Sequence, residues 1–310
     1  MNISMLYAHW KGEPWSFPMS VKAELARRGH FIRDYNMYRL NGEFAYKGEQ
    51  RKYGDDGIND MINDARFGLF VPDVVLAMDY GPFHSARYTR ENIPNAIWVF
   101  EAGDLPQSWG NQWDKACNSD IVLSPDKICT ELYRKQGINA HWWTHCADDN
   151  LYKPYYDEPI LYDAVTTCGP RGPKGQITSK IKDALGDRFF NERYFWGEEY
   201  ARILNRGKLV FQCSQFKEMS RRIFEGMLSG KAVITDRLRP GTGMEDLFID
   251  GTDIILYDEA EDCIDKIRYY SEHNEEREKI AQNGFAKAKQ YHTVKARIDT
   301  LEALISEMKK

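Results

Sequence analysis

The segment from 221 to 236 constrains the fold more than any other part of this sequence. Its apolar residues recur at helical spacing, at Ile223, Phe224, Met227 and Leu228. Gly230 can adopt the left-handed conformation that ends a helix, and the residues at 232–235 form a short β-prone run. A helix followed directly by a buried strand is the repeating piece of an α/β domain. We therefore predict an α/β fold in which Glu225 lies on a helix that enters a cleft.

The size and composition of the chain predict two packed domains. A chain of 310 residues is longer than one ordinary core holds, and domains of about 150 residues are common. Hydrophobic residues make up 42% of the sequence, which is enough for packed cores and argues against disorder. The formal net charge of −5 indicates no basic nucleic-acid-binding domain.

Cysteine usage and hydropathy place the protein in a reducing, aqueous compartment. The six cysteines contain no Cys-x-x-Cys pair, which argues against a zinc site and against a disulfide framework. The apolar run at 1–7 is too short for a signal sequence, and no run approaches the length of a membrane span. We expect a cytoplasmic protein without an integral membrane segment.

Short apolar runs alternate with helical patterns along most of the chain. In the first half, strands are predicted at 3–7, 31–35, 74–78, 96–100, 121–124 and 140–143. Helices are predicted there at 20–28, 57–67, 113–118 and 127–136, with a polar loop at 41–56. The segment 153–159 is predicted to link the domains, and 274–309 to form one or two terminal helices.

Ordered blocks in the second half resemble a known enzyme family. The pattern Arg-x-Phe-Glu-Gly-Met-x-Ser-Gly-Lys-x-Val-Ile-Thr-Asp, which ends at Asp236, resembles the C-terminal signature of GT-B glycosyltransferases. The resemblance is strongest to the CgeB-like group (spore maturation protein type), which is related to retaining glycosyltransferase family four. Further blocks that resemble this group follow in order at 195–205, 245–248, 250–257, 266–270, 276–284 and 291–293.

This resemblance covers about residues 165 to 305 well and the first half only in outline. It implies a GT-B fold, in which two Rossmann-like domains face each other across a cleft. The expected divisions are an acceptor-binding domain at 1–155, a nucleotide-sugar-binding domain at 156–290 and a C-terminal helix at 291–310. In such enzymes this helix commonly returns to the first domain.

Glu225 is the leading donor-site candidate. By resemblance it matches the glutamate that accepts hydrogen bonds from the ribose hydroxyls of a nucleotide sugar; without the surrounding blocks it would read equally well as a solvated helix acid. The first glutamate of the usual Glu-x7-Glu pattern would fall at Lys217, and the nearest acid is Glu218. We therefore expect the diphosphate to meet backbone amides at the helix N-terminus near Ser220. Arg221 and Arg222 are its candidate phosphate partners, and the alternative for one of them is an ordinary surface arginine.

Arg171 and Lys174 are the second pair of cationic candidates. They lie in a Gly- and Pro-rich segment directly after a predicted strand at 164–168. Two cations there would neutralise the leaving nucleoside diphosphate and so lower the barrier to glycosyl transfer. The alternative interpretation is a plain surface turn.

The first half supplies candidates for the acceptor. His9, Glu101 and Asp104 follow predicted strands, where a base could meet an acceptor hydroxyl. Aromatic rings near strand ends stack on sugars or bases, and the candidates are Trp10, Trp15, Trp109 and Trp113. The alternative for each is an ordinary loop residue. Of the other tryptophans, Trp98, Trp142 and Trp143 are predicted to lie mostly in the core.

The leading functional prediction is a glycosyltransferase that moves a sugar from a nucleotide-diphosphate sugar, with UDP-sugar favoured, to a hydroxyl acceptor. The resemblance implies retention of configuration, no cofactor and no bound metal. The acceptor stays open among a saccharide, a protein, a small molecule and, as in phage-type enzymes, a hydroxymethylated DNA base. A non-catalytic GT-B-like binding or scaffold protein is the alternative from another class. A Rossmann dehydrogenase is disfavoured because no Gly-x-Gly-x-x-Gly follows the first strand.

Overall fold

Parallel strands that alternate with helices build both halves of the described chain. The structure is a computed structural model, and it describes residues 1–7, 16–36, 56–78, 86–103, 105, 108–167, 172–215 and 217–310. The chain divides into two compact units. Unit 1 comprises Met1–Trp143 together with Ile298–Lys310, and unit 2 comprises Thr144–Arg297.

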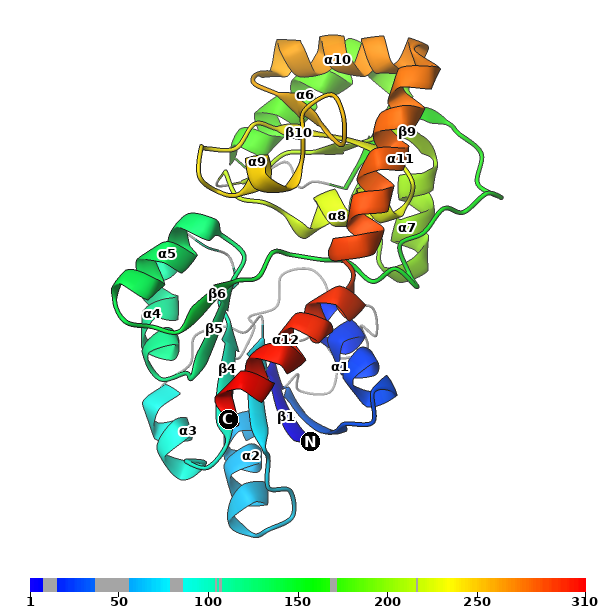
Figure 1. Ribbon diagram of the computed structural model, residues 1–310. Helices are drawn as coiled ribbons and strands as arrows, with labels where there is room; N and C mark the ends of the chain where they lie inside the picture. Colours follow the sequence, from blue (N-terminus) through cyan, green and yellow to red (C-terminus); the bar gives the residue numbers. More distant parts are fainter. Residues whose placement is uncertain are drawn as a thin grey trace. The chain divides into compact units, whose positions relative to one another are not determined.

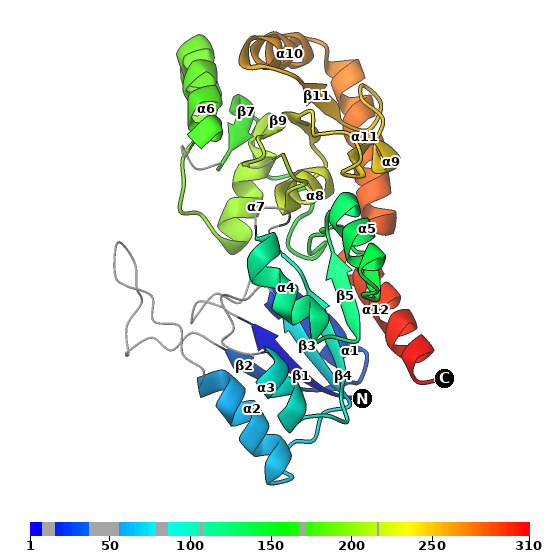
Figure 2. The same ribbon diagram turned by 90° about the vertical axis from the view of Figure 1, so that its left-hand side faces the viewer.

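The described part of unit 1 contains a six-stranded parallel sheet with helices on both faces (Figures 1 and 2). Its strand order is β2-β1-β3-β4-β5-β6. The strands are β1 (Asn2–Tyr7), β2 (Phe31–Asn36), β3 (Val74–Met78), β4 (Ile97–Glu101), β5 (Ile121–Ser124) and β6 (Ala140–Trp142). The helices are α1 (Phe17–Arg27), α2 (Asp56–Arg66), α3 (Ala86–Asn92), α4 (Trp109–Cys117) and α5 (Lys127–Lys135).

The described part of unit 2 contains a five-stranded parallel sheet in the order β11-β10-β9-β7-β8. The strands are β7 (Tyr162–Thr166), β8 (Phe189–Asn191), β9 (Gly207–Gln212), β10 (Ala232–Asp236) and β11 (Ile255–Tyr257). The helices are α6 (Gly172–Leu185), α7 (Gly197–Asn205), α8 (Arg221–Leu228), α9 (Met244–Leu247), α10 (Ala260–Glu272) and α11 (Asn274–Tyr291), with a short 3-10 helix at Gly186–Arg188. The predicted α/β class is confirmed.

The last helix, α12 (Val294–Met308), carries the chain from unit 2 back into unit 1. Within unit 1 it pairs with the end of α1. The Arg28 guanidinium lies 2.7 Å from the Asp299 carboxylate and 2.6 Å from that of Glu302. The His30 ring nitrogen Nε2 lies 2.6 Å from the other Glu302 oxygen. These contacts fix α12 beside α1 on one face of the sheet, opposite α2 to α5 (Figure 1).

Proline stands in the first turn of two helices, at positions where the sequence analysis predicted no helix. The helix predicted from residue 20 begins at Phe17, and Pro18 stands in its first turn. Likewise, Lys174 was predicted in a turn, but α6 already begins at Gly172, with Pro173 second. Proline is accepted in a first helical turn, where its missing N–H would have no intrahelical partner.

Gly226 allows α8 to lie directly on the sheet of unit 2. A β-carbon at this position would lie 2.8 Å from a Val233 methyl carbon and 2.9 Å from a Val210 methyl carbon. Val210 is on β9 and Val233 on β10, so α8 sits across these two strands. A side chain at residue 226 would therefore push the helix, and Glu225 with it, away from the sheet.

We predict that Gly226→Ala destabilises the protein by about 1–3 kcal/mol, the usual cost of overpacking a closed core. The measurement is the denaturant midpoint followed by circular dichroism. Gly110→Ala is the matched control, because it is also a helical glycine and a β-carbon there meets nothing within 4 Å. That control should be neutral or stabilising by up to about 1 kcal/mol. Equal midpoints for the two variants would contradict the close contact of α8 with the sheet.

Candidate functional site

The strand order of unit 2 marks one edge of its sheet as the place for a ligand. The chain moves from β7 to β8 on one side and then to β9 on the other, so the order reverses between β7 and β9. Open parallel sheets bind ligands outside the carboxyl ends of their strands at such a reversal. Here α6 follows β7 and α8 follows β9, so both helices begin at that edge, on adjacent strands.

A buried carboxylate anchors the loop that leads from β9 to α8. Asp236, the last residue of β10, is 1% exposed and accepts hydrogen bonds from the Ser214 backbone N–H at 2.7 Å and the Ser214 hydroxyl at 2.6 Å. The Lys217 ammonium lies 2.9 Å from the same carboxylate. The Lys217 backbone is in the left-handed region, with φ of 56°. Residues other than glycine adopt this conformation at a cost in free energy.

The N-terminus of α8 has the features of an anion site. Ser220 caps the helix, and its hydroxyl accepts from the Arg222 backbone N–H at 3.2 Å. Arg221 and Arg222 are the first two residues of the helix, and both are half-buried. The partial positive charge of a helix N-terminus and two guanidinium groups therefore coincide at this end of α8.

Glu225 lies one turn further along α8 and is buried, at 8% exposure. One oxygen of its carboxylate accepts a hydrogen bond of 2.8 Å from the Tyr200 hydroxyl, on α7. Tyr152 stands edge-on to the Tyr200 ring, with ring centroids 5.8 Å apart. Burial is the main cause that raises the pKa of both tyrosine hydroxyls, and the negative charge of Glu225 raises it further. Sequence analysis named Glu225 and missed the two tyrosines, although Tyr200 lies within a block quoted for the family resemblance.

A buried histidine packs against α8 through Phe224. The His292 ring lies against Phe224, the neighbour of Glu225, with ring centroids 4.7 Å apart. The Arg297 guanidinium donates to His292 Nδ1 at 2.8 Å and to the Thr144 carbonyl at 2.8 Å. Burial, with repulsion from Arg297 and Lys287, lowers the pKa of His292 to about 3. The ring is therefore neutral at physiological pH and accepts a proton only at a cost in folding free energy.

Of the two cationic candidates at 171 and 174, the structure describes only Lys174. Lys174 is half-buried in the first turn of α6, the helix that begins after β7. Among the described residues its ammonium has no hydrogen bond or ion pair, while its carbonyl accepts from the Thr178 hydroxyl at 2.8 Å. Arg171 lies outside the described residues.

The structure describes only some of the candidate residues in unit 1. Glu101 is the last residue of β4 and is 2% exposed. Trp109 begins α4 and stacks on Tyr133, with ring centroids 4.3 Å apart, so one face of its indole is already covered. Trp109 was predicted in a loop or near a strand end but lies on α4, and Trp113, at the start of the helix predicted at 113–118, lies on the same helix. Trp98 and Trp143 are buried as predicted. Outside the described residues lie His9, Trp10, Trp15 and Asp104.

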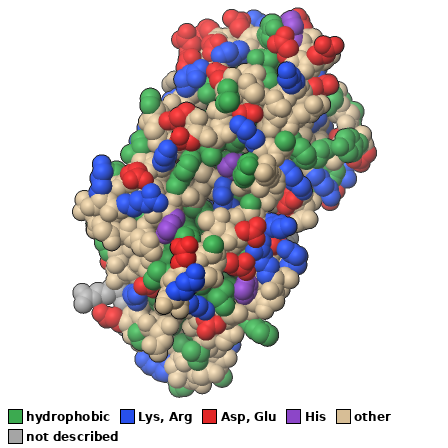
Figure 3. Space-filling view, viewed as in Figure 1, with side chains coloured by type: hydrophobic (Ala, Val, Ile, Leu, Met, Phe, Trp, Pro, Cys, Tyr) green, Lys and Arg blue, Asp and Glu red, His purple; other side chains and the backbone are tan. Residues whose placement is uncertain are grey.

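The described part of the chain shows neither a single-sign charged face in Figure 3 nor a cluster of metal ligands. Basic and acidic side chains are interspersed on the face that Figure 3 draws. No group of three or more His, Cys, Asp or Glu side chains in the described residues is arranged to hold a metal ion. None of the described helices combines the length and the apolar character needed to cross a membrane.

Comparison with known proteins defines the class of fold. Residues 173–303 match the family model described as "Glycosyl transferase-like". This region contains α8 with Glu225 and Ser220, and all of β8 to β11. Together with the two parallel sheets, the structural matches show that the chain has the GT-B fold, as predicted.

Individual solved structures match the chain over nearly its whole length. HepE of Anabaena, solved in complex with UDP-glucose, matches with a TM-score of 0.70 at 14% identity and covers 99% of this chain and 100% of its own. Sucrose-phosphate synthase of Thermosynechococcus elongatus matches with a TM-score of 0.69 at 12% identity, covering 99% of each chain. A glycosyltransferase of Rickettsia africae matches with a TM-score of 0.66 at 11% identity, covering 100% and 98%. No curated protein matches the sequence.

Acidification should destabilise the protein through His292. Its pKa is about 3 when folded and about 6.5 when unfolded, so the unfolded chain binds the extra proton. The contribution of neutral His292 to the free energy of unfolding is fully present above pH 6.5 and is lost as the pH falls from 6.5 toward 3. The loss from this group is about 2 kcal/mol between pH 7 and pH 5. Denaturant titrations at the two pH values measure it.

His292→Gln keeps an acceptor for Arg297 but cannot titrate, so its loss between pH 7 and pH 5 should be smaller than wild type by about 2 kcal/mol. His273→Gln, at an exposed ring on the surface of unit 2, is the control and should keep the wild-type loss. An unchanged pH response in His292→Gln would contradict the buried, neutral state of this ring.

Proposed function

We propose that this protein is a glycosyltransferase that binds a nucleotide-diphosphate sugar at the carboxyl edge of the unit 2 sheet. The observation that carries the proposal is the buried Glu225 carboxylate on α8, one turn from a capped N-terminus flanked by two arginines. Its place within the glycosyl transferase-like match supports the same reading.

Each donor-site residue has a role that fits its chemistry. The Glu225 carboxylate accepts hydrogen bonds from ribose hydroxyls, since a carboxylate offers several acceptor positions. The α8 N-terminus at Ser220, with Arg221 and Arg222, holds the diphosphate. Lys174, and Arg171 by its place in the sequence, add positive charge from the α6 side. UDP-sugar is the favoured donor, because HepE was solved with UDP-glucose.

These cations also serve the reaction. In glycosyl transfer the bond between the sugar C1 and the diphosphate oxygen breaks, and its electron pair leaves with the nucleoside diphosphate. The acceptor hydroxyl forms a new bond to C1 and gives up its proton to a base or to the leaving phosphate. Fixed positive charge stabilises the growing negative charge without a bound metal. Retention of configuration, as in family-four relatives, is the proposed outcome.

The acceptor is proposed to bind unit 1. Glu101 is the candidate base among the described residues, since it closes β4 at the carboxyl edge of that sheet. The half-buried Trp109 ring is a candidate stacking surface for a sugar ring. His9, Asp104, Trp10 and Trp15 keep their proposed roles from the sequence alone.

The donor is tested by thermal shift with UDP-, GDP-, dTDP- and ADP-sugars, followed by a donor-hydrolysis assay on any nucleotide that stabilises the protein. We expect one nucleotide to raise the melting temperature selectively, with slow hydrolysis. Glu225→Ala should lose donor binding by at least about tenfold, as expected for loss of hydrogen bonds to a charged group. Glu275→Ala, an exposed acid on α11, is the matched control and should behave as wild type.

Two results would contradict the proposal. Unchanged donor binding in Glu225→Ala would remove the assigned site. No shift with any nucleotide sugar would instead favour the non-catalytic scaffold protein.

A further inference from the structure

Glu225 meets one tyrosine from α7 and one from the segment that precedes β7. The Tyr200 hydroxyl donates to one carboxylate oxygen, Oε2, at 2.8 Å. The Tyr152 ring stands edge-on to the Tyr200 ring, with ring centroids 5.8 Å apart, and burial together with the negative charge of Glu225 raises the pKa of the Tyr152 hydroxyl. Tyr152, Tyr200 and Glu225 are each 8% exposed, so these contacts are largely shielded from water.

The backbone on both sides of Tyr152 is fixed. The carbonyl of Leu151 accepts from the Tyr155 hydroxyl at 3.2 Å, and the carbonyl of Lys153 accepts from the Asn205 side chain at 3.0 Å. The Asn205 side-chain oxygen in turn accepts from the Tyr155 backbone N–H at 2.9 Å. Tyr152 therefore stands in a segment that is hydrogen-bonded to the end of α7.

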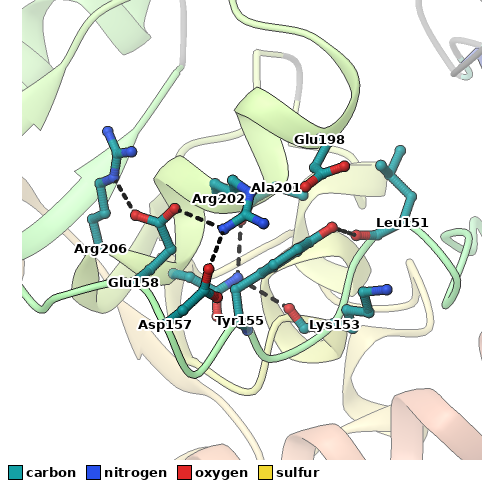
Figure 4. A network of polar contacts seen from close by, with 10 residues as sticks. Leu151, Lys153, Tyr155, Asp157, Glu158, Glu198, Ala201, Arg202 and Arg206 are labelled. Atoms are coloured by element: carbon teal, nitrogen blue, oxygen red, sulfur yellow. Dashed lines mark hydrogen bonds and ion pairs between the residues drawn. The ribbon is translucent and has the colours of Figure 1, made fainter.

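Arg202 reinforces the same attachment, as Figure 4 shows. Its guanidinium lies 2.9 Å from Asp157 and 3.0 Å from Glu158 of the segment, and 2.8 Å from Glu198 on its own helix. It also stacks over the Tyr155 ring, 4.4 Å from the ring centroid. The helix that carries Tyr200 and the segment that carries Tyr152 are thus bound together as one support.

We propose that Tyr200 and Tyr152 are positioning residues that orient the Glu225 carboxylate toward the ribose of the donor. The inference rests on the proposed function. A carboxylate has about four acceptor positions. With Oε2 engaged by Tyr200, the position of the other oxygen, Oε1, is set before a ligand arrives. Preorganised acceptors bind more tightly, because the ordering cost is not met at the moment of binding.

The test separates positioning from a merely structural role by changing the ligand as well as the protein. Calorimetric titration would use UDP or GDP, whichever binds wild type more tightly, and its 2′,3′-dideoxy form. Wild type should prefer the form with both ribose hydroxyls. Tyr200→Phe should weaken binding of that form by about tenfold and change the affinity for the dideoxy form by less than twofold. Tyr152→Phe should act in the same direction.

Tyr156→Phe is the matched control, because it removes the same hydroxyl from a side chain that is 95% exposed in the same segment. It should bind both nucleotides as wild type does. Equal loss for both nucleotides in Tyr200→Phe, or no loss for either, would overturn the positioning role while the donor site stands. Failure of wild type to bind either diphosphate would overturn the donor site and this inference with it.

Discussion

The placement of the Glu225 carboxylate is the constraint on which the unit 2 site depends. A carboxylate removed from water must find hydrogen-bond donors in the protein, and here the Tyr200 hydroxyl supplies one at 2.8 Å. That contact requires α7 and α8 to lie at a fixed distance on the sheet. Gly226 allows α8 to approach the sheet closely. The contact of Phe224 with the His292 ring also holds the helix in place.

The parallel sheet then determines where chemistry can occur. All its strands end at one edge, so the buried Asp236 at the end of β10 can hold the loop that leads into α8. The loop delivers the N-terminus of α8 to the same edge, and α6 begins there after the adjacent strand. A helix N-terminus attracts anions whatever the sequence, and here Ser220 adds a cap and Arg221 and Arg222 add two guanidinium groups, which is why we propose that it holds the diphosphate.

Local sequence patterns predicted the elements well where apolar spacing was strong. The strands at 74–78 and 121–124 have the predicted bounds, and the helix with Glu225 followed by the strand from 232 was predicted from spacing and Gly230 alone. The start of α4 was missed by four residues, because Trp109 is held by stacking on Tyr133 of α5. Such a contact joins residues distant in sequence and leaves no periodic signal. Tyr152 was unpredictable for the same reason, since it lies in a segment without secondary structure and gains its proposed role only from its place beside Tyr200 and near the charge of Glu225.

A crystal structure of the protein soaked with UDP tests the account most directly. We expect the ribose hydroxyls within hydrogen-bonding distance of Glu225, with the Tyr200 contact retained, and the diphosphate at the N-terminus of α8. Nucleotide density at another place on the protein, with Glu225 still in contact only with protein groups, would contradict the assignment of the donor site.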